Sequence, residues 1–232
     1  MKTHLLLVGV ALAGLAACGG SKKRSTPAPV ERNSTSYFRS AVNPNGFFRW
    51  TPARGASSTV VQIEVDDVVL PAGITSTEAR DIVVAARDAW RNELVRTGVP
   101  FNTSTRFRSS SPPFSAAQLA VKVKFVERLA SRVGETVWSI NSKGNLTQLE
   151  VRLAVQAPDG TRLSLESRIE VAVHEFGHAL GINSVGGGTG HSKDRTDTMY
   201  PSLQRAWMLP SKGDFASMRE AYDTRPAVTR FD

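Results

Sequence analysis

The chain has 232 residues, of which 41% are hydrophobic and 22% are charged. These fractions are typical of globular proteins, and they exclude collagen-like, disordered and multi-span membrane proteins. With 29 Lys and Arg against 21 Asp and Glu, the formal charge of +8 permits attraction to anionic surfaces but does not predict a nucleic-acid partner. The single cysteine excludes an intrachain disulfide and a cysteine-rich zinc module.

An apolar run over residues 5–17, preceded by Lys2, is typical of a cleaved signal peptide. Its 13 residues are too few for a membrane-spanning helix, which needs about 20. The run ends in Leu-Ala-Ala-Cys at residues 15–18, which resembles the bacterial lipobox, whose cysteine is acylated and becomes the mature N-terminus. The alternative is an ordinary secretory signal with an incidental cysteine. We favour a lipoprotein, because the only cysteine, Cys18, stands where the lipobox requires it.

The N-terminal features predict a signal peptide over residues 1–17 and a lipidated, polar tether over 18–36. A lipid at Cys18 would anchor the protein to a membrane without spanning it. We therefore expect a lipoprotein of the bacterial envelope, in the outer membrane or at the cell surface, with its domain facing the periplasm or the exterior. The basic cluster 22–24 could contact anionic headgroups or simply be solvated. One domain, 37–232, is expected to follow.

Alternating and periodic apolar patterns in this domain predict a sheet packed on helices, in an α/β or α+β fold. Strands are expected at residues 59–65, 121–126, 136–140 and 149–155, with turns at 142–145 and 158–160. A capping box at 75–78 opens a helix that ends before Gly98. The 3.6-residue period places on the buried face of this helix Ile82, Ala86, Leu94 and either Ala89 or Trp90.

A second capping box, at residues 167–170, predicts the start of the helix that contains the candidate metal ligands. The apolar stripe of this helix consists of Ile169, Val173, Phe176 and Leu180. Beside the stripe lies the motif His-Glu-Phe-Gly-His, residues 174–178. Residues four apart on a helix are separated by about 40° and about 6 Å, so His174 and His178 can reach one metal ion. Glu175 could contact a water on that metal without binding the metal itself.

The distribution of histidines favours a metal site over incidental histidines on a helix surface. The chain has four histidines, of which His4 would leave with the signal peptide. The other three are His174, His178 and His191, all in or just after the motif. A role in core packing or pH sensing would not predict this clustering.

A catalytic zinc site generally has three protein ligands and a water, so the motif needs one more donor. Gly181 can end the helix in a left-handed conformation and turn the chain back. His191 could then return to the metal and complete a site of three histidines. Asp194 and Asp197 are the other donors on the returning segment.

Three segments resemble the metzincin zinc proteases, in particular the matrixins and their bacterial relatives: HEFGHALG at 174–181, GHS at 190–192 and DTMYP at 197–201. The resemblance implies that one zinc ion is bound by His174, His178 and His191. It further implies that Glu175 is the general base and that Met199, in a Met-turn, forms a hydrophobic floor beneath the metal. Tyr200 and Pro201 would line the substrate pocket.

The resemblance also implies an α+β fold of the zincin type. A twisted, mostly parallel sheet would pack on two long helices, with the active-site helix, a Met-turn and a C-terminal helix after residues 211–214. The reaction would be endopeptidase hydrolysis of a protein or peptide by a zinc-bound water, with the substrate extended along the strand at 136–140. We expect a monomer with one catalytic zinc. Bound calcium would be compatible with a matrixin-like protease, but the carboxylates of this sequence are scattered and do not indicate a calcium site.

The sequence departs from the matrixin pattern in two respects. The family spacing would put the third histidine at position 184, where the chain has Ser184, and His191 follows seven residues later, after a glycine-rich insertion. Loops tolerate insertions at a small entropic cost, so His191 stays the predicted ligand. The cysteine switch of matrixin propeptides is missing, because Cys18 is the only thiol.

Two alternatives to this enzyme stay open at the level of the sequence. One is a non-catalytic, metal-binding domain of an envelope lipoprotein. The other is a zincin of another clan, in which a carboxylate is the third ligand. The matrixin-like protease is favoured because the base, the ligands and the Met-turn are all present.

Overall fold

A computed structural model describes residues 32–43, 46–50, 59–96, 101–112, 120–142, 146–184, 188–203 and 209–223, all within one unit, Glu31–Asp232. The predicted signal peptide, Cys18 and most of the predicted tether lie outside the described residues. Among the residues described, no helix combines the length and the apolar composition needed to cross a bilayer.

Five strands form one mixed sheet in the order β2-β1-β3-β5-β4. The strands are β1 (Thr59–Asp66), β2 (Phe101–Phe107), β3 (Val121–Arg128), β4 (Gly134–Ile140) and β5 (Leu146–Gln156). β1 pairs in parallel with β2 and with β3, and β3 pairs in parallel with β5, whereas β4 runs antiparallel to β5 at one edge. The prediction of a mostly parallel sheet in an α+β fold is thereby confirmed.

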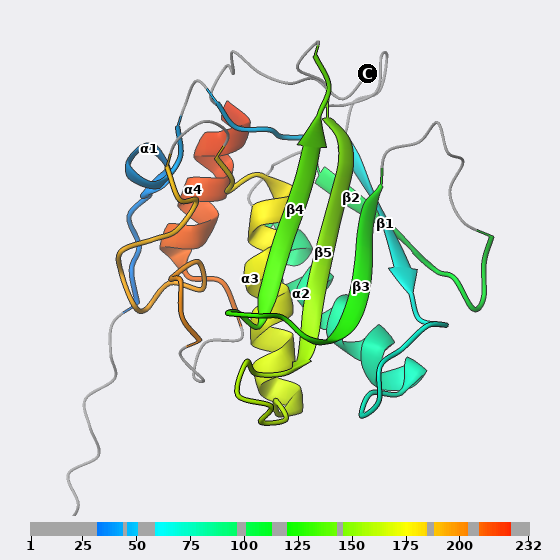
Figure 1. Cartoon of the computed structure of the whole chain (residues 1–232). Coiled ribbons are helices and arrows are strands. Elements are labelled where there is room, and N and C mark those ends of the chain that lie inside the picture. Colours follow the sequence, from blue (N-terminus) through cyan, green and yellow to red (C-terminus); the bar gives the residue numbers. More distant parts are fainter. Residues whose placement is uncertain are drawn as a thin grey trace, which may run out of the picture. The chain divides into compact units, whose positions relative to one another are not determined.

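Two long helices, α2 (Ser76–Arg96) and α3 (Leu165–Leu180), cover the same face of the sheet (Figure 1). Parallel neighbours need a crossover connection, and α2 provides it between β1 and β2. α2 contacts α3 and β2, and α3 contacts β4 and β5, so the helices lie side by side across the sheet. Two shorter helices, α1 (Phe38–Ala41) and α4 (Lys212–Asp223), contact each other.

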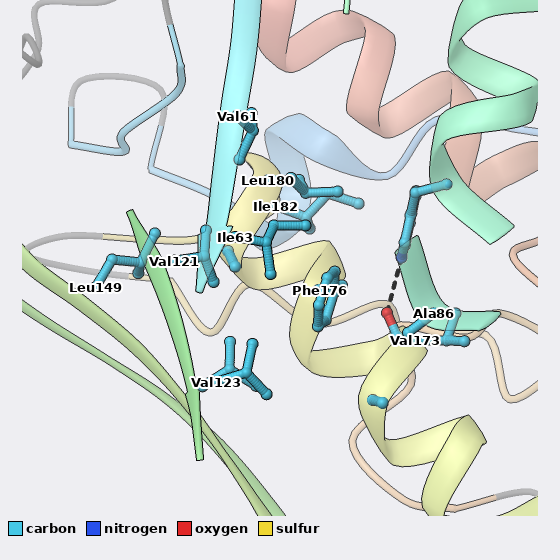
Figure 2. Close-up of a cluster of buried hydrophobic side chains, with 14 of the residues drawn as sticks. Val61, Ile63, Ala86, Val121, Val123, Leu149, Val173, Phe176, Leu180 and Ile182 are labelled. Atoms are coloured by element: carbon cyan, nitrogen blue, oxygen red, sulfur yellow. Dashed lines mark hydrogen bonds between the residues drawn. The ribbon is translucent and has the colours of Figure 1, made fainter. Parts of the chain in front are cut away.

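The hydrophobic core lies between the sheet and these helices, and Figure 2 shows part of it. Every second residue of the central strands is buried on this face, as the period of a strand requires; these include Val61, Ile63, Val121, Val123, Val151 and Leu153. Phe176 and Leu180 of α3 pack against them. Burial of each such side chain contributes about 1.5–3 kcal/mol.

Trp90 settles the one ambiguity in the predicted face of α2. Its side chain is fully buried, whereas Ala89 is only partly buried. The indole Nε1 donates a hydrogen bond to Val173 O at 2.8 Å, drawn as the dashed line in Figure 2. Trp90 therefore packs α2 on α3 and also satisfies its own polar atom.

β2 and the short helix α1 were not predicted from the sequence. β2 contains the polar run Asn-Thr-Ser-Thr-Arg, and it is an edge strand that pairs with β1. An edge strand needs little apolar alternation, so the pattern that revealed β1 and β3 is missing there. β4 and β5 begin at Gly134 and Leu146, a few residues before their predicted starts.

The N-terminus of α3 differs from the prediction, and its C-terminus agrees. Ser164 is the N-cap, and its Oγ accepts a hydrogen bond from the N–H of Ser167 at 3.1 Å. The predicted capping box at 167–170 is therefore wrong, because two serines three residues apart precede the apolar stripe and the first of them caps the helix. Gly181 ends α3 at a φ of +155°, as expected, and its N–H donates to Gly177 O.

Replacement of Ser164 by Ala should lower the free energy of unfolding by about 1 kcal/mol, because the helix loses its N-cap. Ser167→Ala is the matched control and should cost less than about 0.5 kcal/mol, because its Oγ bonds to Ser164 Oγ and caps no backbone N–H of the helix. Urea denaturation followed by circular dichroism measures both values. Equal losses, or a larger loss for Ser167→Ala, would contradict the observed cap.

Candidate metal centre

Three histidines converge at the C-terminal half of α3. His174 and His178 lie one helical turn apart, and His191 returns from the segment that follows the helix. One ring nitrogen of each lies within 4.8 Å of the others, and Nε2 of His178 is 3.2 Å from Nε2 of His191. The cluster could therefore hold a metal ion. In the described part of the chain, no second group of three His, Cys, Asp or Glu is arranged in this way.

Backbone carbonyls fix the tautomers of the two helical histidines. His174 Nδ1 lies 2.7 Å from Thr198 O, and His178 Nδ1 lies 2.7 Å from Ile182 O. A carbonyl oxygen can only accept a hydrogen bond, so each Nδ1 carries the proton and each Nε2 presents a lone pair. Metal-binding histidines are oriented in the same way, with the outer nitrogen donating to a carbonyl or carboxylate.

Burial favours the neutral form of all three imidazoles. It lowers the pKa of His174, and it lowers the pKa of His178 well below the ordinary value, with a further contribution from the two neighbouring imidazoles. The pKa of His191 falls to about 4, first because of burial and then because of His174. Because a neutral imidazole is the form that binds a metal, the cluster is a competent ligand set near pH 7.

Side chains from outside α3 hold its last carbonyl groups. Trp50 Nε1 donates to Ala179 O at 2.9 Å, and the hydroxyl of Tyr222 donates to Leu180 O at 2.8 Å. These carbonyls lack partners within the helix, so the two aromatic side chains complete its C-terminus. The C-terminal end of α3 is therefore anchored to the rest of the domain.

The segment 188–191, which carries the third histidine, is held by the end of α1. It forms an antiparallel bridge with Val42, and two of its N–H groups donate to Ala41 O, at 3.1 and 2.9 Å. Gly190 has a φ of +70°, and a Cβ there would lie 3.2 Å from the ring of His178. Glycine is therefore required next to His191, both for its conformation and for space.

Met199 is fully buried against the helical turn that separates His174 from His178. A Cβ added to Gly177 would lie 2.2 Å from the Met199 sulfur and 2.9 Å from the Trp90 ring. Packing therefore requires glycine at position 177, because the absence of a side chain lets Met199 approach the helix backbone.

Asp214, near the start of α4, fixes the segment around Met199. This side chain is fully buried, and its Oδ2 accepts hydrogen bonds from the N–H groups of Thr198 at 2.8 Å and Ser211 at 2.7 Å. Its Oδ1 accepts from Met199 N at 3.3 Å and from the Tyr37 hydroxyl at 2.6 Å. The carboxylate thus replaces the backbone partners that an irregular segment lacks.

Neither aspartate proposed as an alternative ligand joins the histidine cluster. Asp197 is fully buried in a separate network, where its oxygens accept hydrogen bonds from Ser192 Oγ and Ser211 Oγ at 2.5 Å and from Asn33 Nδ2 at 2.8 Å. Burial raises its pKa. Asp194 Oδ1 accepts from the N–H and the hydroxyl of Thr196, both at 2.8 Å.

The N-terminal arm, residues 32–37, packs on the same segment and on α4. Arg32 Nε donates to Thr196 O, and the N–H of Asn33 donates to the Thr196 hydroxyl, both at 3.0 Å. Asn33 O also accepts from the N–H of Gly213 at 3.0 Å. Residues 32–36 were expected in the tether, whereas the structure places them against the domain, so the packed chain starts before Tyr37.

Glu175 lies beside the cluster and is buried, with 6% of its surface exposed. Its Oε2 accepts a hydrogen bond from the Thr136 hydroxyl at 2.8 Å. Burial raises the pKa of Glu175 to about 7, although the hydrogen bond from Thr136 and the charge of Arg132 oppose this shift. Glu175 is therefore a desolvated carboxyl group next to three possible ligands.

A cavity of about 700 Å³ brings these groups together, and its lining includes all three histidines and Glu175. Thr136 and Trp138 of β4 line one side, and Tyr200 and Pro201 line another. Cavities of several hundred Å³ are typical of ligand sites. The two residues proposed to line a substrate pocket thus reach the same cavity as the candidate ligands.

No family model matches this chain, and no curated protein matches its sequence. The site is therefore characterised by its own residues and geometry. The resemblance to matrixins rests on the segments 174–181, 190–192 and 197–201 of the sequence.

Thr136, Asp214 and Tyr37 hold parts of the site and were not predicted from the sequence. A signal for Asp214 was present, because the pattern Ser211-x-x-Asp214 is a capping box. In the structure the Asp214 N–H donates to Ser211 Oγ at 2.9 Å, and the Ser211 N–H donates back to Asp214. Thr136 and Tyr37 have no local sequence signal, because their partners are distant in the chain.

Replacement of His191 by Ala should weaken Zn²⁺ binding by at least about 100-fold, because it removes one of three converging donors. Asp194→Ala is the control and should keep the affinity of the unmodified protein, because its carboxylate bonds to Thr196. Competition titration against a chromogenic chelator measures the dissociation constants. Loss of binding in Asp194→Ala together with retention in His191→Ala would show that a carboxylate is the third ligand.

Proposed function

We propose that this chain is a zinc-dependent endopeptidase of the matrixin-like metzincin type. The observation that carries the proposal is the convergence of three imidazoles and one buried glutamate on a single cavity. A structural metal site is usually closed by four protein ligands, whereas a catalytic site keeps a position open. Three histidines beside a cavity correspond to the second kind of site.

The donor set fits zinc. Imidazole nitrogens bind zinc at about 2.0–2.1 Å in tetrahedral geometry, which separates two ligand nitrogens by about 3.3 Å. The 3.2 Å between Nε2 of His178 and Nε2 of His191 agrees with that separation. A carboxylate as third ligand has less support, because Asp194 and Asp197 are engaged in other hydrogen bonds.

Glu175 is the residue that moves the proton in this proposal. Zinc in the site would supply a Lewis acid that makes water more acidic and polarises the scissile carbonyl. The Glu175 carboxylate takes a proton from the attacking water and delivers it to the leaving amine. No covalent intermediate with the protein is needed, which suits a cavity that offers a carboxylate and imidazoles.

The substrate would be an extended segment of a protein or peptide, bound along β4. Within the described residues, β4 has a single strand neighbour, β5, so its other edge can accept an added strand. Thr136 and Trp138 of β4 also line the cavity. A peptide on this edge would therefore pass beside Glu175.

The Glu175→Gln variant tests the enzyme directly. It should bind about one zinc per chain, as the unmodified protein does, while kcat for peptide cleavage falls at least about 100-fold because the base is lost. Glu166→Gln, an exposed position near the start of α3, is the control and should stay active. Cleavage of a peptide library, scored by mass spectrometry with and without a chelator, provides the measurement.

Two outcomes of this experiment would overturn the proposal. Full activity in Glu175→Gln would place the general base elsewhere. A zinc-loaded protein that cleaves no peptide in the library would support the alternative, a non-catalytic metal-binding domain.

We also propose that the protein is anchored to a bacterial envelope membrane by a lipid on Cys18, on the basis of the lipobox-like segment. Acyl chains bind membranes with about 0.8 kcal/mol per buried methylene, so loss of the acylated residue should release the protein. Cys18→Ser should abolish labelling by a fatty-acid analogue in a bacterial host and move the protein to the soluble fraction. Ser21→Ala, the control, should stay labelled and membrane-bound. Unchanged labelling of Cys18→Ser would disprove this anchor.

A further inference from the structure

Thr136 is the side chain through which β4 reaches Glu175. Its hydroxyl lies 2.8 Å from Glu175 Oε2 and 3.0 Å from the main-chain oxygen of the same residue. A hydroxyl has one hydrogen to donate, and a carboxylate is a stronger acceptor than a carbonyl. Among the described residues, the hydroxyl of Thr136 is the one side-chain donor to this carboxylate, and it engages Oε2 rather than Oε1.

Gly134 forms the other half of this contact. Residues two apart on a strand face the same side, so Gly134 and Thr136 both face α3. A Cβ added to Gly134 would lie 2.8 Å from Glu175 Oε1 and 2.5 Å from the side chain of Val171. The missing side chain therefore leaves space for one carboxylate oxygen, while the hydroxyl two residues later binds the other.

The strand that carries both residues is fixed in register. Gly134 pairs with Leu153 and Thr136 pairs with Val151, on the antiparallel ladder between β4 and β5. Leu153 and Val151 are both buried in the core. The contact to Glu175 is therefore made from a rigid element, as a precise site requires.

We infer that Thr136 is a positioning residue for Glu175: its hydroxyl binds Oε2 and thereby holds Oε1 in the space beside Gly134, a residue that lines the cavity. This inference rests on the proposed function, in which Glu175 must face the attacking water. A glutamate has three rotatable side-chain bonds and can adopt other rotamers when nothing holds its carboxylate. Loss of the hydroxyl should then reduce the rate of the chemical step and leave metal binding intact.

Thr136→Val and Thr136→Ser test this role, because valine keeps the shape and removes the donor, whereas serine keeps the donor. With zinc-loaded protein, Thr136→Val should lower kcat about ten-fold or more with KM and zinc content unchanged, and Thr136→Ser should restore at least half of the original kcat. Thr147→Val on β5 is the matched control. Its exposed hydroxyl donates to the carbonyl of Ser139, and neither of these two residues lines the cavity.

The outcomes separate this inference from the proposed function. If the unmodified protein cleaves peptides and Glu175→Gln does not, an unchanged kcat in Thr136→Val overturns the positioning role alone. A fall in melting temperature without a fall in kcat also overturns it, because the hydroxyl would then be merely structural. If the unmodified protein cleaves nothing, crystal structures of it and of Thr136→Val decide the matter. A Glu175 carboxylate in the same place in both would refute the inference, and a displaced carboxylate would support it.

Discussion

The hydrogen bonds from imidazole Nδ1 atoms to main-chain carbonyls are the interactions on which this site depends. Each joins α3 to a different segment, because His174 binds Thr198 O beside Met199, and His178 binds Ile182 O at the start of the turn toward His191. The same bond that selects the tautomer also sets the position of the segment relative to the helix. The tautomer of each histidine and the position of the segment that it contacts therefore depend on the same hydrogen bond, and neither can change alone.

The segment around Met199 has no regular secondary structure, so its polar groups need partners from elsewhere. The buried carboxylates of Asp197 and Asp214 supply these partners. A buried carboxylate is costly unless several donors surround it, and each of these accepts at least three hydrogen bonds. Because Asn33 and Tyr37 are among the donors, the N-terminal arm belongs to the network that positions the methionine. The arm is therefore part of the domain and not only a spacer.

The helices and strands that could be predicted are those in which buried apolar residues recur with the period of a helix or a strand. β1, β3, β4, β5, α2 and α3 have such patterns, and the spacing of His174 and His178 follows from one helical turn. β2 is polar because it lies at an edge, and the cap of α3 depends on which of two serines has an extended backbone. The contacts of Thr136 with Glu175 and of Tyr37 with Asp214 span 39 and 177 positions. Contacts this distant in the chain leave no local pattern, so only the folded structure reveals them.

The position of His191 shows why the number of residues after a helix does not decide whether a side chain can return to a cluster on that helix. His191 lies between two anchored neighbours, because the Gly190 N–H donates to Ala41 O at 2.9 Å and the Ser192 N–H donates to Met199 O at 2.9 Å. These bonds fix His191 from both sides, so the residues before them can vary in number without moving it. The entropic cost of a longer loop rises only with the logarithm of its length, by about 0.6 kcal/mol for each doubling. His191, although seven residues beyond the matrixin spacing, therefore joins His174 and His178, since its immediate neighbours, and not the length of the loop, determine where it lies.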